Sequence, residues 1–223
     1  MRVGHTYRHF ETIERIIMKK SISLLAMPSW MHIKDTLISI EKQKDELEID
    51  SLHIDVMDGH FAPNIAFGPA LVRDIATHTS LPLDLHLMID CFDTMLPHYK
   101  TIPHRHMYIP FEVIVSHRRS NIAPFAYDDT YLKHISLNIE TPINDVLFYV
   151  KHIESVLLMT VHVGFAGQKM IKDRLKIVDQ LKKANPRLTI LVDGGVHENT
   201  FKIVKQFDVD GIVMGSWFFS CDR

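Results

Sequence analysis

Short runs of β-branched and aliphatic residues alternate with stretches of helical periodicity along the chain. The apolar runs predict eight strands, near Ser21–Met27, Leu52–Val56, Pro82–Met88, Phe111–Ser116, His134–Ile139, Val156–Val161, Leu188–Val192 and Gly211–Met214. The periodic stretches predict helices over His32–Leu47, Pro69–His78, Thr94–Tyr99, Pro142–Ile153, Ile171–Ala184 and Glu198–Phe207, with one short helix over Tyr127–Lys133.

Regular alternation of strands and helices indicates parallel strands, because a crossover helix joins parallel neighbours. Eight such strands fit a (β/α)8 TIM barrel at the lower end of its size range. A doubly wound open sheet is the alternative, but no Gly-rich phosphate turn follows the first predicted strand. We therefore predict an α/β protein built as a (β/α)8 barrel.

At the two ends of the chain the pattern departs from a complete (β/α)8 barrel. We expect residues 21–223 to form the barrel domain and residues 1–20 to be an N-terminal extension. After the last strand only Ser216–Arg223 remain, too few for a good eighth helix. One hypothesis places a helix over Arg8–Met18 in the eighth position, since Phe10, Ile13 and Ile17 form an apolar stripe. The alternatives are a functional start at Met18 after a disordered segment, or a partner subunit over the groove.

Composition and charge exclude several classes of protein. Hydrophobic residues make up 46% and charged residues 23% of the 223, close to globular averages, so a full core is available. The 25 Lys and Arg against 27 Asp and Glu give a net charge of −2, which argues against nucleic acid or anionic lipid as partner. No apolar stretch is long enough for a bilayer, and the N-terminus lacks a secretory signal. Cys91 and Cys221 form no disulfide framework, so we expect a cytoplasmic protein.

Glycine is scarce, and its placement predicts a phosphate site. Six of the nine glycines follow residue 160, and five of these six lie in the runs GFAG, DGG and MGS after the sixth, seventh and eighth predicted strands. Backbone N–H groups of such loops bind phosphate without Lys or Arg, and barrel phosphate sites commonly lie at the last strands. The predicted substrate-binding residues of these loops are Gly164, Phe165, Ala166, Gly167, Gly194, Gly195, Gly215 and Ser216.

The densest group of chemically active residues is HIDVMDGHF, from His53 to Phe61. His53 and Asp55 are two apart on a strand and share a face, which in a barrel is the interior. His86 lies on the third strand, and Asp193 ends the seventh. Singly, each has a plain explanation as a core histidine or a turn residue. Together, two imidazoles and two carboxylates predict a site for one divalent ion, Zn, Mn, Fe or Co.

Most of the other histidines are expected on the surface. His117, at the end of the predicted fourth strand, is a further candidate contact near the site. The surface candidates are His78, His98, His104, His106 and His152.

The runs HIDVMDGHFAPNIAFGP, LPLDLHLMI, NIETP, LLMTV, GFAGQKMI, VDGGV and MGS resemble the ribulose-phosphate 3-epimerases, including the related allulose-6-phosphate 3-epimerases. The resemblance implies a TIM barrel of the ribulose-phosphate-binding type, with one divalent metal held by His53, Asp55, His86 and Asp193. It also implies that Asp55 and Asp193 are the acid–base pair, one on each face of the substrate's carbon 3. Further implied substrate contacts are Ser23 (with Ser21 and Ser29 as alternative matches), Met57, His86, Met88 and Met159.

The sequence departs from the family at two places. His162-Val163 stands where relatives usually have Asn-Pro or Asp-Pro, and Pro103–Tyr131 is less family-like. These departures bear on the substrate more than on the reaction. The implied function is interconversion of D-ribulose 5-phosphate and D-xylulose 5-phosphate by a pentose-phosphate-pathway isomerase, with allulose 6-phosphate as the alternative substrate. Two other hypotheses are a different barrel enzyme for a phosphorylated metabolite and a non-catalytic sugar-phosphate sensor. We also expect a homo-oligomer.

Overall fold

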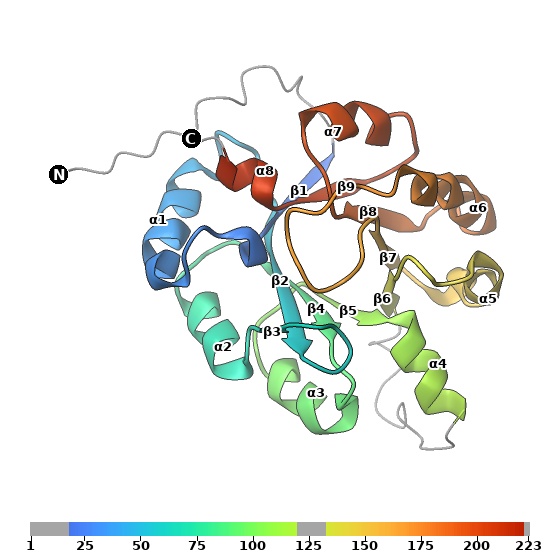
Figure 1. Cartoon of the computed structure of the whole chain (residues 1–223), viewed down its shortest axis with the longest axis horizontal. Helices are drawn as coiled ribbons and strands as arrows, with labels where there is room; N and C mark the ends of the chain where they lie inside the picture. The colour runs from blue at the N-terminus through green and yellow to red at the C-terminus, as the bar shows by residue number, and fades with distance from the viewer. Residues whose placement is uncertain (1–17, 120–132, 221–223) are drawn as a thin grey trace.

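Eight parallel strands close into a barrel in the computed structural model, which describes residues 18–119 and 133–220 (Figure 1). The pairing runs round the barrel, and β1 closes it by pairing with both β9 and β2. A two-residue strand, β3 (Ile65–Ala66), adds antiparallel to the end of β2. The barrel strands are β1 (Lys19–Ser23), β2 (Ser51–Asp58), β4 (Leu83–Met88), β5 (His106–Pro110), β6 (His134–Leu137), β7 (Ser155–Met159), β8 (Thr189–Asp193) and β9 (Gly211–Met214).

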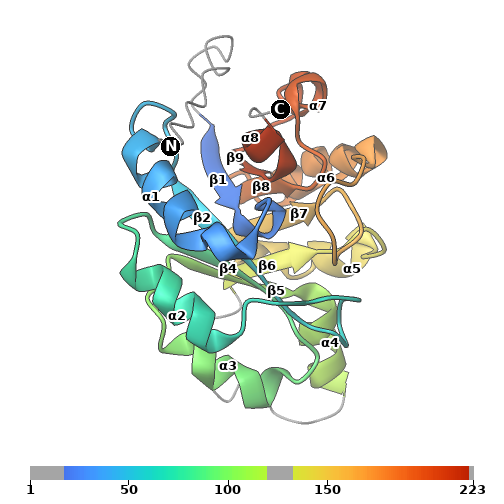
Figure 2. The same ribbon diagram turned by 60° about the vertical axis from the view of Figure 1, so that its left-hand side comes forward.

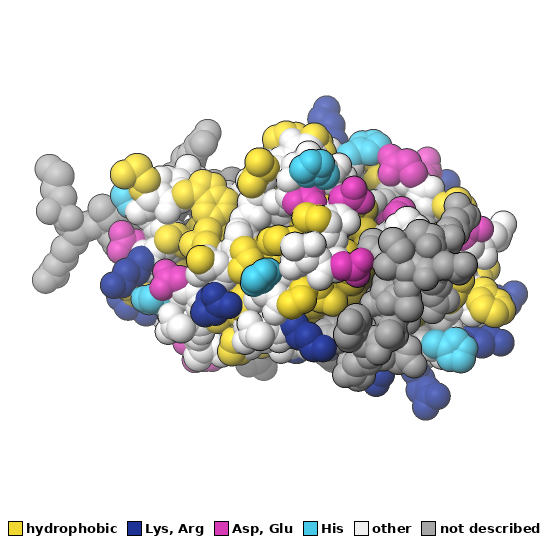
Figure 3. All heavy atoms as spheres, turned by 90° about the horizontal axis from the view of Figure 1, so that it is seen from below, with side chains coloured by type: hydrophobic (Ala, Val, Ile, Leu, Met, Phe, Trp, Pro, Cys, Tyr) yellow, Lys and Arg dark blue, Asp and Glu magenta, His cyan; other side chains and the backbone are white. Residues whose placement is uncertain are grey.

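Helices surround the barrel, which confirms the predicted (β/α)8 fold (Figures 1 and 2). No helix within the described ranges has the length and apolar character needed to cross a membrane. On the face in Figure 3, basic, acidic and histidine side chains are interspersed with apolar ones. The α-helices are α1 (Ile33–Gln43), α2 (Pro69–Thr77), α3 (Phe92–Lys100), α4 (Phe111–Arg119), α5 (Ile143–Leu147), α6 (Ile177–Ala184), α7 (Glu198–Val204) and α8 (Ser216–Phe219). Short 3-10 helices cover Leu24–Ala26, Trp30–His32, Val150–His152 and Lys172–Lys176.

The strands are buried on both faces, and alternation decides which residues enter the barrel. In β4, Leu83, Leu85 and Leu87 pack outward into the large core shared with the helices. The intervening residues of β4, among them His86, face the barrel interior. A second apolar cluster, separate from that core, consists of Tyr108, Leu157, Met159, Val161, Leu191 and Val213.

The predicted fourth strand is wrong. Phe111–Ser116 belongs to helix α4, and the strand is His106–Pro110, immediately before it. The apolar run FEVIVS has high β propensity, but Phe111, Val113 and Ile114 bury against the core as part of a helix. The strand His106–Pro110 was not predicted, because the polar His106 and the terminal Pro110 interrupt its apolar pattern. Because of this error, His117 lies in α4 and not at the end of a strand.

The other elements agree in type with the prediction and differ in their bounds. The first strand stops at Ser23, where a 3-10 helix begins, and the helix predicted over Pro142–Ile153 is broken into two short pieces. Among the described residues after β9, the one helix is the four-residue α8, as expected. The hypothesis of a helix over Arg8–Met18 concerns residues outside the described ranges, apart from Met18, and so does nearly all of the short helix predicted over Tyr127–Lys133.

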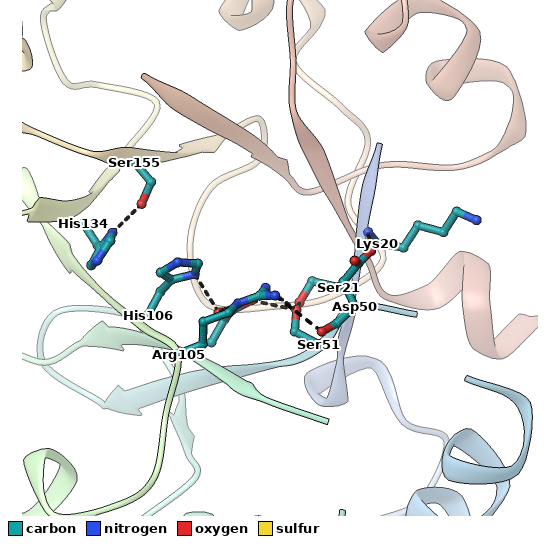
Figure 4. Close-up of polar contacts among 9 residues, drawn as sticks. Lys20, Ser21, Asp50, Ser51, Arg105, His106, His134 and Ser155 are labelled. Atoms are coloured by element: carbon teal, nitrogen blue, oxygen red, sulfur yellow. Dashed lines mark hydrogen bonds and ion pairs between the residues drawn. The ribbon is translucent and has the colours of Figure 1, made fainter. Parts of the chain in front are cut away.

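The amino-terminal end of the barrel is closed by a polar layer, here called the barrel floor (Figure 4). Its centre is Asp84, whose carboxylate accepts hydrogen bonds from Arg105 Nη2 at 2.6 Å and Nε at 3.1 Å. Ser51 Oγ and His106 Nδ1 lie 2.6 and 2.9 Å from the same carboxylate. Burial alone would raise the pKa of Asp84, but hydrogen bonds with His106 and Arg105 outweigh it and lower the pKa to about 2. The floor residues are Ser21, Ser51, Asp84, Arg105, His106, His134 and Ser155.

Two histidines lie side by side in the barrel floor. The ring centroids of His106 and His134 are 4.6 Å apart, and His134 Nδ1 lies 2.6 Å from Ser155 Oγ. His106 was expected on the surface, but Asp84 holds it in the partly buried floor. Burial and the neighbouring His106 lower the pKa of His134 to about 4, although Glu154 and Asp84 act in the opposite direction.

The low pKa of His134 predicts a loss of stability in acid. The unfolded chain takes up the proton near pH 6.5 and the folded chain only near pH 4, so the free energy of unfolding falls as the pH drops through this window. In His134→Asn, which keeps a polar group but does not titrate, we expect a smaller fall in the free energy of unfolding between pH 7.5 and 5. Urea unfolding at several pH values measures this. The exposed His78→Asn serves as control, and equal pH slopes for wild type and His134→Asn would contradict the prediction.

Candidate active site and metal centre

The carboxyl ends of three strands bring together the four residues predicted as metal ligands. His53 and Asp55 come from β2, His86 from β4 and Asp193 from the end of β8. One ligand atom of each lies within 4.8 Å of the others, and all four residues are buried. The register of the barrel produces this grouping, because Asp55 is level with His86 on the neighbouring strand.

The two carboxylates approach the imidazoles closely. His53 Nε2 lies 3.2 Å from Asp55 Oδ1 and 3.4 Å from Asp193 Oδ2. His86 Nδ1 lies 3.5 Å from Asp55 Oδ1. The Ser23 hydroxyl donates to the other oxygen of Asp55, Oδ2, at 2.7 Å. Asp55 is therefore surrounded by polar groups from β1, β2 and β4.

The environment separates the acidities of the two carboxyl groups. Burial would raise the pKa of Asp55, but the two histidines outweigh it and hold the pKa well below the usual range of a carboxyl. Burial raises the pKa of Asp193 to about 7, and the charge of Asp55 adds to this against the opposing effect of His53. Burial also opposes a charge on His53, yet Asp55 and Asp193 raise its pKa to about 9. Two carboxyl groups with divergent pKa values suit an acid–base pair.

The donor set fits a divalent cation. Both ring nitrogens of His53 and Nδ1 of His86 are buried, and none of the three has a hydrogen-bond partner among the described residues. A buried polar atom with no partner is costly, on the order of 1–3 kcal/mol, and native structures rarely leave one without a reason. A cation between the four side chains would engage His53 Nε2 and His86 Nδ1 together with both carboxylates. Mixed imidazole and carboxylate donors are typical of Zn, Mn, Fe or Co sites.

A cavity opens above this cluster at the mouth of the barrel. Asp55 and Asp193 reach its surface, whereas His53 and His86 are fully buried beneath it. The cavity is also lined by Ser23 and by the predicted methionines Met57, Met88 and Met159. Of the three candidate serines, Ser21 lies in the barrel floor and Ser29 caps the 3-10 helix at Trp30–His32. Ser23 is thus the candidate that the structure places at the cavity.

The three glycine-containing loops meet at the other side of the same cavity. The loop after β7 supplies Gly164, Phe165, Ala166 and Gly167, and Gly194 and Gly195 follow β8. Gly215 and Ser216 lie where α8 begins after β9. Within the described lining there is no Lys or Arg, so an anion bound here would depend on backbone N–H groups.

Side chains outside the predicted set fix the loop after β7. Asn64 Nδ2 donates to the carbonyl oxygen of Gly164 at 2.7 Å. Gln168 Nε2 donates to the carbonyl oxygens of His162 at 2.6 Å and Phe165 at 2.8 Å. The turn after β8 is held by the Thr160 hydroxyl, which donates to the carbonyl oxygen of Gly194 at 2.6 Å. These residues shape the cavity without belonging to the glycine runs.

Two of the glycines are required for different reasons. Gly195 has φ +66° and lies so close to Met170 that a Cβ would be 2.4 Å from the Met170 backbone nitrogen. Gly167 has φ +78°, but a Cβ there would meet nothing within 4 Å. Gly195 is therefore required by close packing as well as by its positive φ, whereas at Gly167 the positive φ alone favours glycine and the space beside it is open.

The unusual pair His162-Val163 is accommodated at the rim of the cavity. His162 is 62% exposed, and its Nδ1 lies 3.0 Å from Glu140 Oε1, so it joins the loop after β7 to the loop after β6. Val163 packs in part against Met57 and Met88. An ion pair this exposed contributes about 0–1 kcal/mol.

Sequence reasoning missed one residue that touches the cluster directly. Ser136 on β6 is fully buried, and its Oγ lies 3.0 Å from His86 Nε2. The available signal was a single serine between the outward-facing Ile135 and Leu137. That position faces the barrel interior, where a hydroxyl needs a polar partner.

Comparisons with known proteins point to one family. The model of the ribulose-phosphate 3 epimerase family matches residues 21–219. A ribulose-phosphate 3-epimerase of Helicobacter pylori is 32% identical over 218 residues, covering 92% of this chain and 93% of that protein. The enzyme of that name from Bacillus subtilis is 34% identical over 184 residues, covering 75% and 78%.

Similarity to solved structures concerns the fold alone. The tryptophan synthase α subunit of Campylobacter jejuni matches with a TM-score of 0.53 at 17% identity, covering 93% of this chain and 90% of that one. The N-(5'-phosphoribosyl)anthranilate isomerase of Pyrococcus furiosus matches with a TM-score of 0.53 at 13% identity, covering 90% and 88%.

Metal binding should stabilise the protein through this cluster. At a Zn²⁺ concentration 100 times its Kd, we expect the free energy of unfolding to rise by about 2.7 kcal/mol, which corresponds to roughly 5–10 °C in Tm. A chelator should reverse the increase, and His86→Ala should abolish the zinc-dependent increment. The exposed His98→Ala should keep it. Differential scanning calorimetry with and without Zn²⁺ measures both, and a wild type insensitive to Zn²⁺, Mn²⁺, Fe²⁺ and Co²⁺ would argue against a metal site.

Proposed function

Since this chain belongs to the ribulose-phosphate 3-epimerase family, we propose that it is a metal-dependent isomerase that interconverts D-ribulose 5-phosphate and D-xylulose 5-phosphate. The observation that carries the proposal is the pair of carboxyl groups that line the cavity at the barrel mouth. Asp55 and Asp193 come from different strands, and both lie within 3.4 Å of the same nitrogen of His53. Their pKa values are shifted in opposite directions.

We assign the metal site to His53, Asp55, His86 and Asp193. When bound, a divalent ion of the Zn, Fe, Mn or Co type supplies Lewis-acid stabilisation of the negative charge that develops on the substrate oxygens. The protein holds the ligands in place before substrate arrives, because all four are fixed on strands of the barrel wall. Such preorganised charge needs no rearrangement during the reaction.

The two aspartates carry the proton transfer. One ionised carboxylate removes the proton from carbon 3, and the protonated carboxyl of the other delivers a proton to the opposite face of that carbon. The configuration is thereby inverted, and the two groups have exchanged protonation states. Exchange with solvent restores them for the next turnover. In the cluster without a cation, burial raises the pKa of Asp193 to about 7 while the pKa of Asp55 is lowered, so Asp193 is the carboxyl that holds a proton more readily.

The remaining cavity residues orient the substrate. Backbone N–H groups of the three glycine-containing loops bind the phosphate, and Ser23 and His86 contact the sugar beside the cluster. Met57, Met88 and Met159 lie against the reacting carbons. They offer apolar, polarizable contact and no proton that could compete with the aspartates.

A coupled assay separates this proposal from its alternatives. Purified protein loaded with Co²⁺ or Zn²⁺ is given D-ribulose 5-phosphate and, separately, allulose 6-phosphate. Turnover of the first supports the proposal, and turnover of the second alone identifies the alternative substrate. Turnover that survives complete chelation would indicate a different barrel enzyme. Binding of either sugar phosphate without turnover would indicate a sensor.

Removal of either proton carrier should abolish activity. We expect Asp55→Asn and Asp193→Asn each to lower kcat by about 10²–10⁴-fold, since an amide cannot exchange the proton. In wild type, reaction in D₂O should place deuterium at carbon 3 of recovered substrate and product. Asp173→Asn, which alters an exposed carboxylate, is the control. If either active-site variant kept more than about a tenth of wild-type kcat, a loss below roughly 1.4 kcal/mol, the mechanism of two carboxylates would be wrong.

Closing the open space beside Gly167 should weaken substrate binding. We expect Gly167→Val to raise KM about tenfold or more, because lost hydrogen bonds to a charged group are worth about 1.5–3 kcal/mol. Metal content should stay unchanged, since the loop lies apart from the ligands. Gly167→Ala, which imposes the same strain at φ +78° with a much smaller side chain, is the control and should raise KM less. An unchanged KM in Gly167→Val would move the phosphate site elsewhere.

A further inference from the structure

The two histidines of the cluster are held in different ways. His53 has no hydrogen-bond partner on either ring nitrogen within the described structure. His86 has none on Nδ1, but its Nε2 lies 3.0 Å from the hydroxyl oxygen of Ser136. Both His86 and Ser136 are fully buried. The serine is therefore the one hydrogen-bonding contact of His86 among the described residues.

The barrel brings Ser136 to His86 from across one strand. β6 is separated from β4 by β5, and Ser136 is level with Pro110, the last residue of β5. Ile135 and Leu137 on either side of it pack outward into the core beneath the helices. The Ser136 side chain consequently points into the barrel at the height of the cluster. Its short side chain leaves room for the imidazole and still reaches the ring nitrogen.

A neutral imidazole has one N–H group and one lone pair, and the two nitrogens share these roles. His86 Nδ1 faces the cluster, where it lies 3.5 Å from Asp55 Oδ1. A lone pair on Nδ1 requires the proton on Nε2, and a buried N–H without an acceptor would cost about 1–3 kcal/mol. The Ser136 hydroxyl oxygen provides that acceptor.

We propose that Ser136 is a positioning residue for the metal centre, which fixes the ring of His86 with Nε2 protonated and the Nδ1 lone pair directed at the cation. The inference rests on the proposed function only in that the cluster binds a divalent ion. Groups that hydrogen bond to a metal-ligating histidine typically change metal affinity by 10–100-fold when they are removed.

Two substitutions of nearly equal shape isolate the hydroxyl. Ser136→Thr and Ser136→Val add similar bulk at a buried position, but only the first keeps the hydroxyl. Zn²⁺ affinity is measured by competition with a chromophoric chelator, and the Co²⁺ absorption spectrum reports the ligand geometry. We expect Ser136→Val to bind Zn²⁺ about 10–100-fold more weakly than Ser136→Thr, with an altered Co²⁺ spectrum. Thermal unfolding of the metal-free variants should be similar for the two.

The control is Ser155→Ala, which removes the buried hydroxyl that contacts His134 in the barrel floor (Figure 4). It should leave Zn²⁺ affinity within about twofold of wild type, since no metal ligand is touched. Equal affinities of the Thr and Val variants, whether at the wild-type value or both below it, would overturn the inference, because the hydroxyl would then be irrelevant. If the added bulk prevents the Thr and Val variants from folding, Ser136→Ala is measured instead. A Zn²⁺ affinity of Ser136→Ala equal to that of wild type would then overturn the inference. A wild type that binds neither Zn²⁺ nor Co²⁺ would instead refute the proposed metal site.

Discussion

The burial of ionisable groups inside a closed barrel is the constraint on which the rest of this structure depends. A charged side chain taken out of water is strongly disfavoured unless another charge or a cation compensates it. His53, Asp55, His86 and Asp193 meet this condition because the barrel brings one ligand atom of each within 4.8 Å of the others, with Asp55 paired to His86 on the neighbouring strand. A shift of one residue in β2 would turn both of its ligands into the apolar core outside. The barrel therefore has to close in a single register for the site to exist.

The same constraint appears a second time, at the barrel floor, and is met in another way. Asp84 lies two residues before His86 on β4, so both side chains enter the barrel, one layer apart. Asp84 is compensated within the protein by Arg105, and by His106 and Ser51, and its hydrogen-bonding capacity is largely used. The floor is thus electrostatically complete without any ligand. Its role is to close the amino-terminal end of the barrel with polar residues. Apolar side chains take over further along the strands.

Sequence patterns predicted the fold because they reflect which faces of each element are buried. Alternating strands and helices required parallel pairing, and the spacing of His53 and Asp55 placed both inside the barrel. The fourth strand could not be found in this way. His106 is polar and faces inward, and its partner Asp84 is 22 residues earlier in the sequence. For the same reason Ser136 was missed, since its partner His86 is 50 residues away. Periodicity reports burial along one strand, but contacts between strands depend on register, which a single sequence does not display.

The barrel floor and the barrel mouth differ in whether their buried carboxylates have a positive partner within the protein. This difference explains why a cation would be stabilised at the cluster of His53, Asp55, His86 and Asp193. At the floor, Asp84 has a permanent positive partner. At the mouth, three buried imidazole nitrogens make no hydrogen bond within the described parts of the chain, and two carboxylates approach the same nitrogen of His53. Each unsatisfied atom disfavours the metal-free fold by about 1–3 kcal/mol. A bound divalent ion would remove part of this penalty and separate the two carboxylates by a positive charge. The free energy that the unsatisfied atoms cost the metal-free fold is thereby partly recovered when the ion binds, and it contributes to the affinity for the ion. A fully compensated arrangement like that of the floor would make a more stable barrel, but it would leave no site for chemistry.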